Sequence, residues 1–314
     1  SQSRGLGDVY KRQYKNFEII TMPPPSSGGL HLIQMLNILE SFDIKSLKHN
    51  SPSYVLLLNE VMKYAYADRS QYLGDPDYVD VPVKKLISKD YAENISKKIT
   101  IDRVTQSDDI KAGMYIDLES DETTHFSIAD KFGNLVSTTY TLNSSFGSKV
   151  VIAKTGILMN NEMDDFSSAP GVPNQFGLLG EKFNEIQPSK RPLSSMTPTI
   201  VFKNNSPFLI MGSPGGSRII TAVLQNFLNI AEFEMNLADS INKPRVHQQW
   251  YPDLLFLEKG FDELHAKKIT ELGQEIYFID PGTALESIMI KNNYFYGYGD
   301  CLLYTSDAAD ERNS

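Results

Sequence analysis

The chain has 314 residues, of which 41% are hydrophobic and 22% are charged. This balance is typical of a globular protein and excludes disorder throughout the chain. The formal net charge is -9, which argues against non-specific nucleic-acid binding, because proteins of that class carry a basic surface. No stretch approaches about 18 uninterrupted apolar residues, so the sequence predicts no membrane span.

The two ends of the chain are interpreted as foreign sequence. Asp8–Gln13 can be encoded by GATGTGTATAAGAGACAG and Cys301–Ser306 by TGTCTCTTATACACATCT. These strings are reverse complements apart from their outermost bases, as sequencing adapters at opposite ends of one insert would be. We therefore expect residues 1–13 and 301–314 to be translated adapter and not part of the natural domain. The remaining segment, Tyr14–Asp300, is expected to be an internal piece of a longer gene.

The first part of that segment, Tyr14–Glu122, is predicted to be mostly helical. Apolar residues recur at helical spacing between Leu30 and Leu39, after a loop rich in proline and glycine. Ser53 is a candidate N-cap for a second helix, because its hydroxyl can accept from a free N–H of the first turn. The polar and acidic stretch Ser107–Glu122 is predicted to be an exposed linker.

From Thr123 onward the sequence favours strands. Short runs of β-branched and aromatic residues predict them, and Asp130–Asn134 is typical of a hairpin loop. Helices followed by many strands predict an α+β domain built from packed layers. The expected elements are strands at His125–Ala129, Val136–Leu142, Thr199–Phe202, Phe208–Met211, Glu286–Ile290 and Tyr294–Tyr296, and a helix at Arg218–Ile230.

Two local features could carry chemistry. Small residues at Gly212–Ser217 expose backbone N–H groups before a helix N-terminus, which suits a developing oxyanion. A plain strand-to-helix turn is the simpler interpretation of this feature taken alone. Thr123 would be a good nucleophile if cleavage freed its α-amine, because an amine with a pKa of about 7.7–8.0 can take the hydroxyl proton. An ordinary strand threonine is the alternative.

Metal and thiol chemistry find no support in the sequence. The five histidines show no metal-ligand spacing such as HExxH and are interpreted as structural or surface residues. The single cysteine, Cys301, lies in the foreign end. Disulfides, a thiol nucleophile and a cysteine-based metal site are therefore excluded for the remaining segment.

Six blocks of sequence, taken in order, resemble a known family. They read MPPPSSGGLHLIQMLNILE, YAYADRSQYLGDPDYV, TTHFSIADKFGNLVSTTYTLNSSFGS, GILMNNEMDDFS, RPLSSMTPTIV and GSPGGSRIITAVLQ. Together they resemble the γ-glutamyltranspeptidases, or glutathione hydrolases, over Tyr14–Gly299. That family belongs to the N-terminal-nucleophile hydrolases, so the resemblance implies an αββα sandwich, incomplete here on its N-terminal side. It implies the C-terminal part of a large subunit at 14–122 and a slightly truncated small subunit at 123–300.

The resemblance also implies a catalytic mechanism. A precursor would cut itself between Glu122 and Thr123, when the Thr123 hydroxyl attacks the preceding carbonyl and water resolves the ester. The freed Thr123 would then be nucleophile through its side chain and general base through its amine. Thr141 matches the threonine that orients the nucleophile, and Gly215 and Gly216 match the oxyanion hole.

Substrate contacts are implied in the same way. Asn143, Glu162 and Asp165 match residues that grip the α-amino group of the γ-glutamyl donor, where a carboxylate makes a charge-assisted bond to an ammonium. Ser194 and Ser195 match the pair that holds the donor α-carboxylate.

A lid over the pocket is implied at Pro170–Gly180. Within it, Phe176 stands where some relatives carry a tyrosine whose hydroxyl bonds to the residue matching Asn143, so lid closure is expected to be looser. Glu162 stands where glutamine is common, and a glutamate accepts from an ammonium equally well.

The implied reaction is ping-pong transfer of a γ-glutamyl group. The donors would be glutathione and other γ-glutamyl compounds, the acceptors water, amino acids or dipeptides, and neither a metal nor an organic cofactor is expected. The large and small subunits would form a heterodimer from one precursor, in the periplasm or outside the cell, with no nucleic-acid partner. The missing half of the large subunit would supply an arginine to the donor carboxylate. The fragment is therefore expected to bind the donor poorly and to be inactive. The apolar surface left by the missing half is expected to make it unstable or prone to aggregation.

Three other interpretations remain open. A cephalosporin or glutaryl acylase shares the fold but needs no α-amino clamp, so Asp165 together with the Ser194–Ser195 pair argues against it. A poly-γ-glutamate depolymerase can lack the lid, so Pro170–Gly180 argues for a smaller substrate. A catalytically inactive relative is disfavoured by the intact Thr123 and Thr141.

Overall fold

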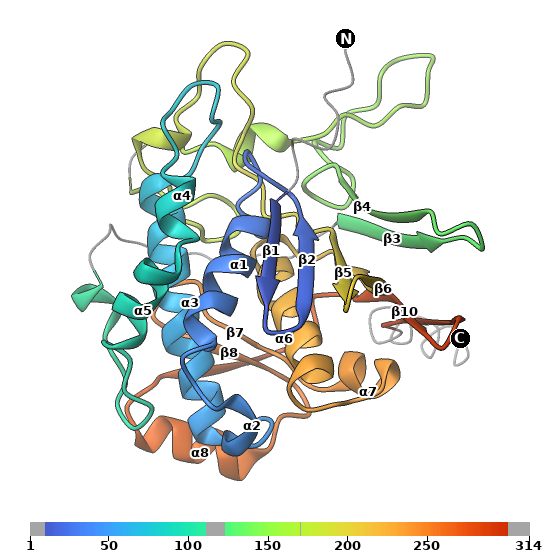
Figure 1. Cartoon of the computed structure of the whole chain (residues 1–314). Helices are drawn as coiled ribbons and strands as arrows, with labels where there is room; N and C mark the ends of the chain where they lie inside the picture. The colour runs from blue at the N-terminus through green and yellow to red at the C-terminus, as the bar shows by residue number, and fades with distance from the viewer. Residues whose placement is uncertain (1–9, 111–122, 170, 301–314) are drawn as a thin grey trace, which may run out of the picture.

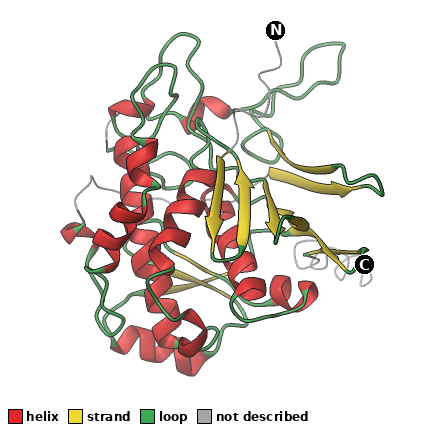
Figure 2. Ribbon diagram, viewed as in Figure 1, coloured by secondary structure: helices red, strands yellow, loops and turns green. Residues whose placement is uncertain are grey.

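The computed structural model describes residues 10–110, 123–169 and 171–300. Its strands form three sheets, and most of its helices gather on one side of the strands (Figure 2). The strands are β1 (Tyr10–Tyr14), β2 (Phe17–Thr21), β3 (Thr123–Ala129), β4 (Leu135–Thr141), β5 (Thr199–Lys203), β6 (Ser206–Gly212), β7 (Val246–His247), β8 (Leu255–Glu258), β9 (Ile276–Ile279), β10 (Glu286–Lys291) and β11 (Tyr294–Gly299).

Eight α-helices accompany these strands in the described ranges. None of them is both long and apolar enough to cross a membrane. They are α1 (Gly28–Leu39), α2 (Ile44–Leu47), α3 (Pro52–Tyr72), α4 (Val83–Leu86), α5 (Lys89–Ser96), α6 (Ile219–Ala231), α7 (Leu237–Asn242) and α8 (Glu263–Glu271).

A six-stranded antiparallel sheet is the middle layer, in the order β1-β2-β5-β6-β10-β11. Helices α1 and α6 cover one face of this sheet, α3 packs against α1, and the β3–β4 hairpin packs on the other face of the sheet (Figure 1). Strands β7, β8 and β9 form a small separate sheet beside the helices. The described residues thus provide an α, a β and a second β layer of the expected αββα sandwich.

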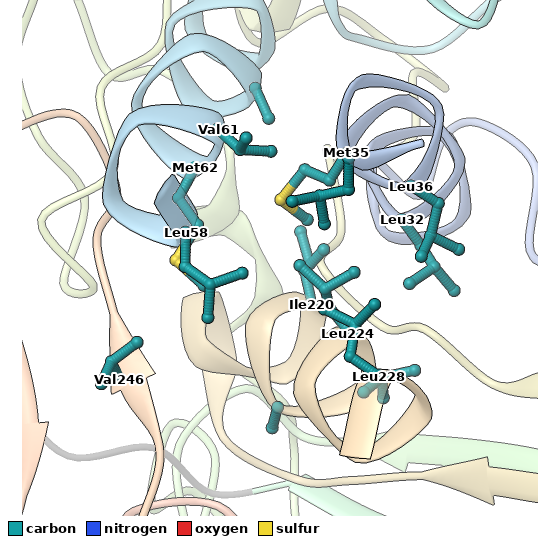
Figure 3. Packing of buried hydrophobic residues seen from close by; sticks show 14 of the residues in the cluster. Leu32, Met35, Leu36, Leu58, Val61, Met62, Ile220, Leu224, Leu228 and Val246 are labelled. Carbon is teal, nitrogen blue, oxygen red and sulfur yellow. The ribbon is translucent and has the colours of Figure 1, made fainter. Parts of the chain in front are cut away.

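The core lies between the helices and the middle sheet. Every residue of α1 is buried, and its polar side chains His31, Gln34 and Asn37 have hydrogen-bond partners inside the protein. Side chains from three helices, including Met35 of α1, Met62 of α3 and Ile220 of α6, point toward one another in this core (Figure 3). Close packing here fixes α3 and α6, and these two helices carry residues of the candidate site.

Strand β6 contacts the layers on both faces of the middle sheet. Leu209 and Met211 point into the helical core, and the alternation of a strand turns Gly212 toward the hairpin. A Cβ on Gly212 would lie 2.2 Å from Cε1 of His125, so the His125 ring of β3 rests directly on the β6 backbone. The Ser137 hydroxyl of β4 donates to the Met211 carbonyl at 3.0 Å and adds a second attachment of the hairpin.

Most of the predicted elements are confirmed, within a few residues at their ends, including the hairpin, the later strands and the helix after the glycine turn. The first part is mostly helical as predicted, although β1 and β2 form an antiparallel pair at one edge of the sheet. One prediction about its helices is wrong. The N-cap of α3 is Ser51 rather than Ser53, since the Ser51 hydroxyl accepts from the Tyr54 N–H and Pro52 occupies the first helical position.

The linker prediction is wrong for Ser107 and Ile110, which are buried, whereas Asp108 and Asp109 are exposed as expected. Ser107 is 1% exposed, and its hydroxyl donates to the Trp250 carbonyl at 2.6 Å. The rest of the predicted linker, 111–122, lies outside the described residues, as do 1–9 and 301–314. Tyr10–Gln13, which we attribute to adapter, pair with β2 in strand β1. Backbone pairing accepts almost any sequence, so the foreign origin of these residues stays a prediction.

Candidate active site

The hairpin itself brings two threonine hydroxyls together. Thr123 is the first residue of β3 and stands directly opposite Thr141, the last residue of β4. Opposed residues in antiparallel strands have neighbouring side chains, and the Thr123 Oγ1 donates to the Thr141 Oγ1 at 3.3 Å. Glu122 lies outside the described residues, so cleavage between Glu122 and Thr123 stays a prediction.

A sharp turn after β4 supports this pair. Asn143 has a φ of 75°, a left-handed conformation that asparagine tolerates better than most residues. Its backbone N–H donates to the Thr141 Oγ1 at 2.8 Å, and its side-chain amide donates to the Asn161 carbonyl at 3.2 Å. Asn143 therefore ties the end of β4 to the loop that precedes the acidic residues of the pocket.

Two glycines form a turn between β6 and α6. The φ angles of Gly215 and Gly216 are 132° and 48°, and a Cβ on Gly215 would lie 2.5 Å from Cγ2 of Thr283. Only glycine fits this position without strain. Left-handed residues before a helix turn their N–H groups toward one concave side, and the N-terminus of α6 adds positive potential. Gly216 lines the same pocket as Thr123, so this turn can receive a developing negative charge.

One wall of the pocket is acidic. Glu162 and Asp165 begin and end a short 3-10 helix, and Asp165 lines the pocket. Burial, followed by the charge of Glu162, raises the pKa of Asp165 well above its usual range. Burial also raises the pKa of Glu162. An ammonium group placed here would relieve the repulsion between the two carboxylates, so this wall favours a cation.

Another wall of the pocket carries hydrogen-bond donors backed by a positive charge. Ser194 and Ser195 both line the pocket, and Arg69 of α3 donates from Nη2 to the Ser195 Oγ at 3.1 Å. Its Nε donates to the Ser27 Oγ at 3.0 Å. Arg69 was missed at the level of the sequence, although the quoted block YAYADRSQYLGDPDYV contains it. No local signal distinguishes Arg69, because the same helix carries other charged residues such as Glu60, Lys63 and Asp68.

Two residues of the segment predicted to be a lid, Phe176 and Leu178, line the pocket. Phe176 is 9% exposed, and its carbonyl accepts from Nε2 of Gln249 at 3.0 Å. The Ser217 hydroxyl, next to Gly216, donates to Oε1 of the same Gln249 at 2.8 Å. One amide group therefore holds the lid segment and the glycine turn together. Phe176 has no hydroxyl for Asn143, and the looser closure expected from this difference stays a prediction.

Eight of the predicted site residues line one pocket, whose cavity volume is about 20 Å³, room for about one water molecule. Two further predicted residues do not line it: Gly215 directly precedes Gly216, and Glu162 begins the 3-10 helix that Asp165 ends. A larger hollow of about 1010 Å³ lies among hairpin loops at the far end of β3 and β4. It contains none of the predicted site residues, and we place the chemistry at the smaller pocket because the reactive groups converge there. The residues that line this pocket are Thr123, Thr141, Asn143, Asp165, Phe176, Leu178, Ser194, Ser195, Met196, Gly216 and Ile219.

The histidines lie where a structural role would put them. His31, His125 and His247 are buried, and burial lowers the pKa of His125 to about 4. Its ring Nδ1 is 2.8 Å from the Thr139 Oγ1 within the hairpin. Within residues 10–110, 123–169 and 171–300, no group of three or more histidine, cysteine, aspartate or glutamate residues could hold a metal ion. The absence of a cofactor stays a prediction.

The layers and the pocket define an N-terminal-nucleophile hydrolase fold. The structure of cephalosporin acylase from Bacillus halodurans matches 94% of this chain and 51% of that chain with a TM-score of 0.77, at 23% sequence identity, which bears on the fold alone. More specifically, the chain belongs to the γ-glutamyltranspeptidase family, whose sequence model matches residues 6–307.

Two close relatives agree with this assignment. The glutathione hydrolase proenzyme of Escherichia coli K12 is 48% identical over 288 residues, which cover 91% of this chain and 50% of the relative. A mutant γ-glutamyltranspeptidase from Helicobacter pylori is 47% identical, and its structure matches 57% of this chain and 99% of that chain with a TM-score of 0.56. The chain thus spans about half the length of the curated relatives it matches.

Proposed function

We propose that the whole protein to which this chain belongs is a γ-glutamyltransferase and glutathione hydrolase. One observation carries the proposal: the Thr123 hydroxyl, held at 3.3 Å from Thr141, lies in a pocket with the Asp165 carboxylate on one wall and serine hydroxyls on another. A γ-glutamyl donor carries an α-ammonium and an α-carboxylate next to each other, and these two walls complement its two charges.

The first chemical step would be self-cleavage. The Thr123 Oγ1 attacks the Glu122 carbonyl carbon, the peptide C–N bond breaks, and the chain is joined through an ester to the Thr123 oxygen. Breaking the C–N bond frees the Thr123 amine, which receives the hydroxyl proton. Water then hydrolyses the ester, which releases the Glu122 carboxylate and restores the Thr123 hydroxyl. That amine can take the proton of its own hydroxyl, so one residue supplies both base and nucleophile.

The same hydroxyl would then carry out the transfer. Attack on the γ-carbonyl of the donor gives a negative oxygen that the N–H groups of the Gly215–Gly216 turn can stabilise, and loss of one such donor typically costs about 2.7–4 kcal/mol of barrier. The leaving amine takes the proton, and a γ-glutamyl-Thr123 ester remains. Water, an amino acid or a dipeptide accepts the acyl group in the second half of the cycle.

The acidic wall distinguishes this proposal from an acylase. A glutaryl donor lacks the α-ammonium, so it would leave Glu162 and Asp165 without a cation in a pocket that already raises the pKa of both. The pair therefore favours donors with an ammonium over those without one. We also propose that the processed subunits stay together as a heterodimer in the periplasm or outside the cell, as the family resemblance implies.

Intact-mass analysis of the purified whole protein tests the proposal. Two chains are expected, the smaller beginning at Thr123. In a separate activity assay, the same protein should release arylamine from a γ-glutamyl anilide. Thr123→Ala should stay uncut, whereas Thr124→Ala, at the exposed neighbouring position, should be cut normally. A folded wild-type protein that remains one chain for days would refute the proposal. Equal turnover of a glutaryl anilide would favour the acylase instead.

A further inference from the structure

Arg69 is a buried cation that contacts hydroxyl groups. It is 4% exposed, near the C-terminal end of α3, and its two hydrogen bonds within the described part of the chain go to Ser27 and Ser195. A buried charge normally needs a paired opposite charge in contact with it. Two hydroxyls and the more distant charge of Asp165 compensate this guanidinium only in part, which suggests that it serves a bound anion.

The direction of each hydrogen bond follows from the chemistry of arginine. A guanidinium has only donors, so Ser27 and Ser195 both accept from it. Ser27 passes its own proton on, because its hydroxyl donates to the Ser194 carbonyl at 2.7 Å. Ser195 has accepted from Arg69, and its own O–H has no acceptor among the described residues.

Ser194 is set in the same way. Its Oγ accepts from the Met196 N–H at 3.1 Å, and its O–H has no acceptor within the described ranges. Two neighbouring hydroxyls in one pocket therefore each have an internal donor and an unused proton. Two such hydroxyls can both donate to one anion. A carboxylate suits them, because its two oxygens can each accept one hydrogen bond.

We propose that Arg69 is a positioning residue that holds the Ser195 hydroxyl as a donor to the α-carboxylate of the γ-glutamyl donor. This inference rests on the proposed function. The guanidinium also places a positive charge behind the serine wall, and it interacts with Asp165 across the pocket. Arg69 thus makes the serine wall the positive side of the pocket, opposite in charge to Asp165, and so fixes which end of the donor each wall receives.

A double-mutant cycle in the whole protein tests this role. The variants are Arg69→Met, Ser195→Ala and the double variant, each assayed with a γ-glutamyl anilide and with its analogue in which a carboxamide replaces the α-carboxylate. A hydrogen bond to a charged group is at stake. Arg69→Met should therefore lower kcat/KM for the carboxylate donor about 10- to 100-fold, mainly through KM, and at most about threefold for the carboxamide.

The double variant separates an indirect role from a general one. If Arg69 acts through Ser195, adding Arg69→Met to Ser195→Ala should cost at most about twofold more. Arg69→Lys keeps the buried charge and can replace Arg69→Met if the methionine variant does not fold. Its KM for the carboxylate donor should lie between those of the wild type and Arg69→Met. Arg103→Met makes the same change at an exposed site and should leave both donors unaffected.

Two failures can be told apart. Wild-type protein that releases no arylamine from the carboxylate donor would refute the proposed function, and this inference with it. An active wild type with additive losses in the cycle, or with equal losses for both donors, would overturn the role of Arg69 alone.

Discussion

Replacing Thr141 by valine removes one oxygen from the candidate site and keeps the shape of the side chain. That oxygen accepts from the Thr123 hydroxyl at 3.3 Å and from the Asn143 N–H at 2.8 Å. The two bonds have separate consequences. The first concerns the orientation of the nucleophile, and the second concerns the stability of the turn that follows β4.

The structure sets a magnitude for each loss. Asn143 is 3% exposed, so its N–H would lose its acceptor in a buried place, which costs about 1–3 kcal/mol of unfolding free energy. The bond from Thr123 is longer than the usual 2.7–2.8 Å for two hydroxyls and is worth about 0.5–1 kcal/mol. Its loss alone slows the reaction about 2- to 5-fold. A displacement of Thr123 by about 1 Å would bring the loss toward 100-fold.

Both effects can be measured on one preparation of the whole protein. Intact mass against time gives the rate of self-cleavage, arylamine release gives kcat, and denaturant unfolding gives stability. Thr138→Val is the matched control, because Thr138 lies on the same strand and makes no side-chain hydrogen bond among the described residues. A Thr141→Val protein that cleaves itself and turns over within twofold of wild type would refute the assigned role of Thr141.

Other predictions concern pH dependence and helix stability. Glu162→Gln removes the like charge that helps to raise the pKa of Asp165, so that pKa should fall. Because the donor ammonium binds ionised Asp165, the acidic limb of the kcat/KM profile should move to lower pH, and an unchanged or higher limb would contradict the assignment. Ser51→Ala should lower the unfolding free energy by about 0.5–2 kcal/mol through loss of the α3 cap. Ser53→Ala should change the unfolding free energy little. A larger loss for Ser53→Ala than for Ser51→Ala would instead support Ser53 as the N-cap.

The sequence predicts best those elements whose signal is local. The hairpin was found because Asp130–Asn134 closes its own loop, with the Asp130 carboxylate accepting from the Phe132 and Asn134 N–H groups. The α3 cap was misplaced by two residues because both serines fit the cap preference. The proline between them decides the matter, since proline is favoured at the first helical position.

Features that depend on distant contacts could not be predicted from spacing. Strands β1 and β2 have only five residues each, too few for a clear period, and β2 is fixed by pairing with β5. The buried Ser107 depends on Trp250, which is 143 positions away. Arg69 shows the same limit in the site, because its partner Ser195 lies 126 positions along the chain.

The contact between His125 and Gly212 sets the spacing between the strand that carries the nucleophile and the strand that leads to the glycine turn. His125 stands two residues after the nucleophile on β3, and Gly212 stands three residues before the first glycine of the turn on β6. With no side chain on Gly212 to intervene, the thickness of one imidazole ring sets the gap between these two strands. This contact therefore helps to set the distance from the Thr123 oxygen to the N–H groups of the glycine turn, although neither His125 nor Gly212 lines the pocket. Any side chain at 212 would widen that gap from outside the pocket.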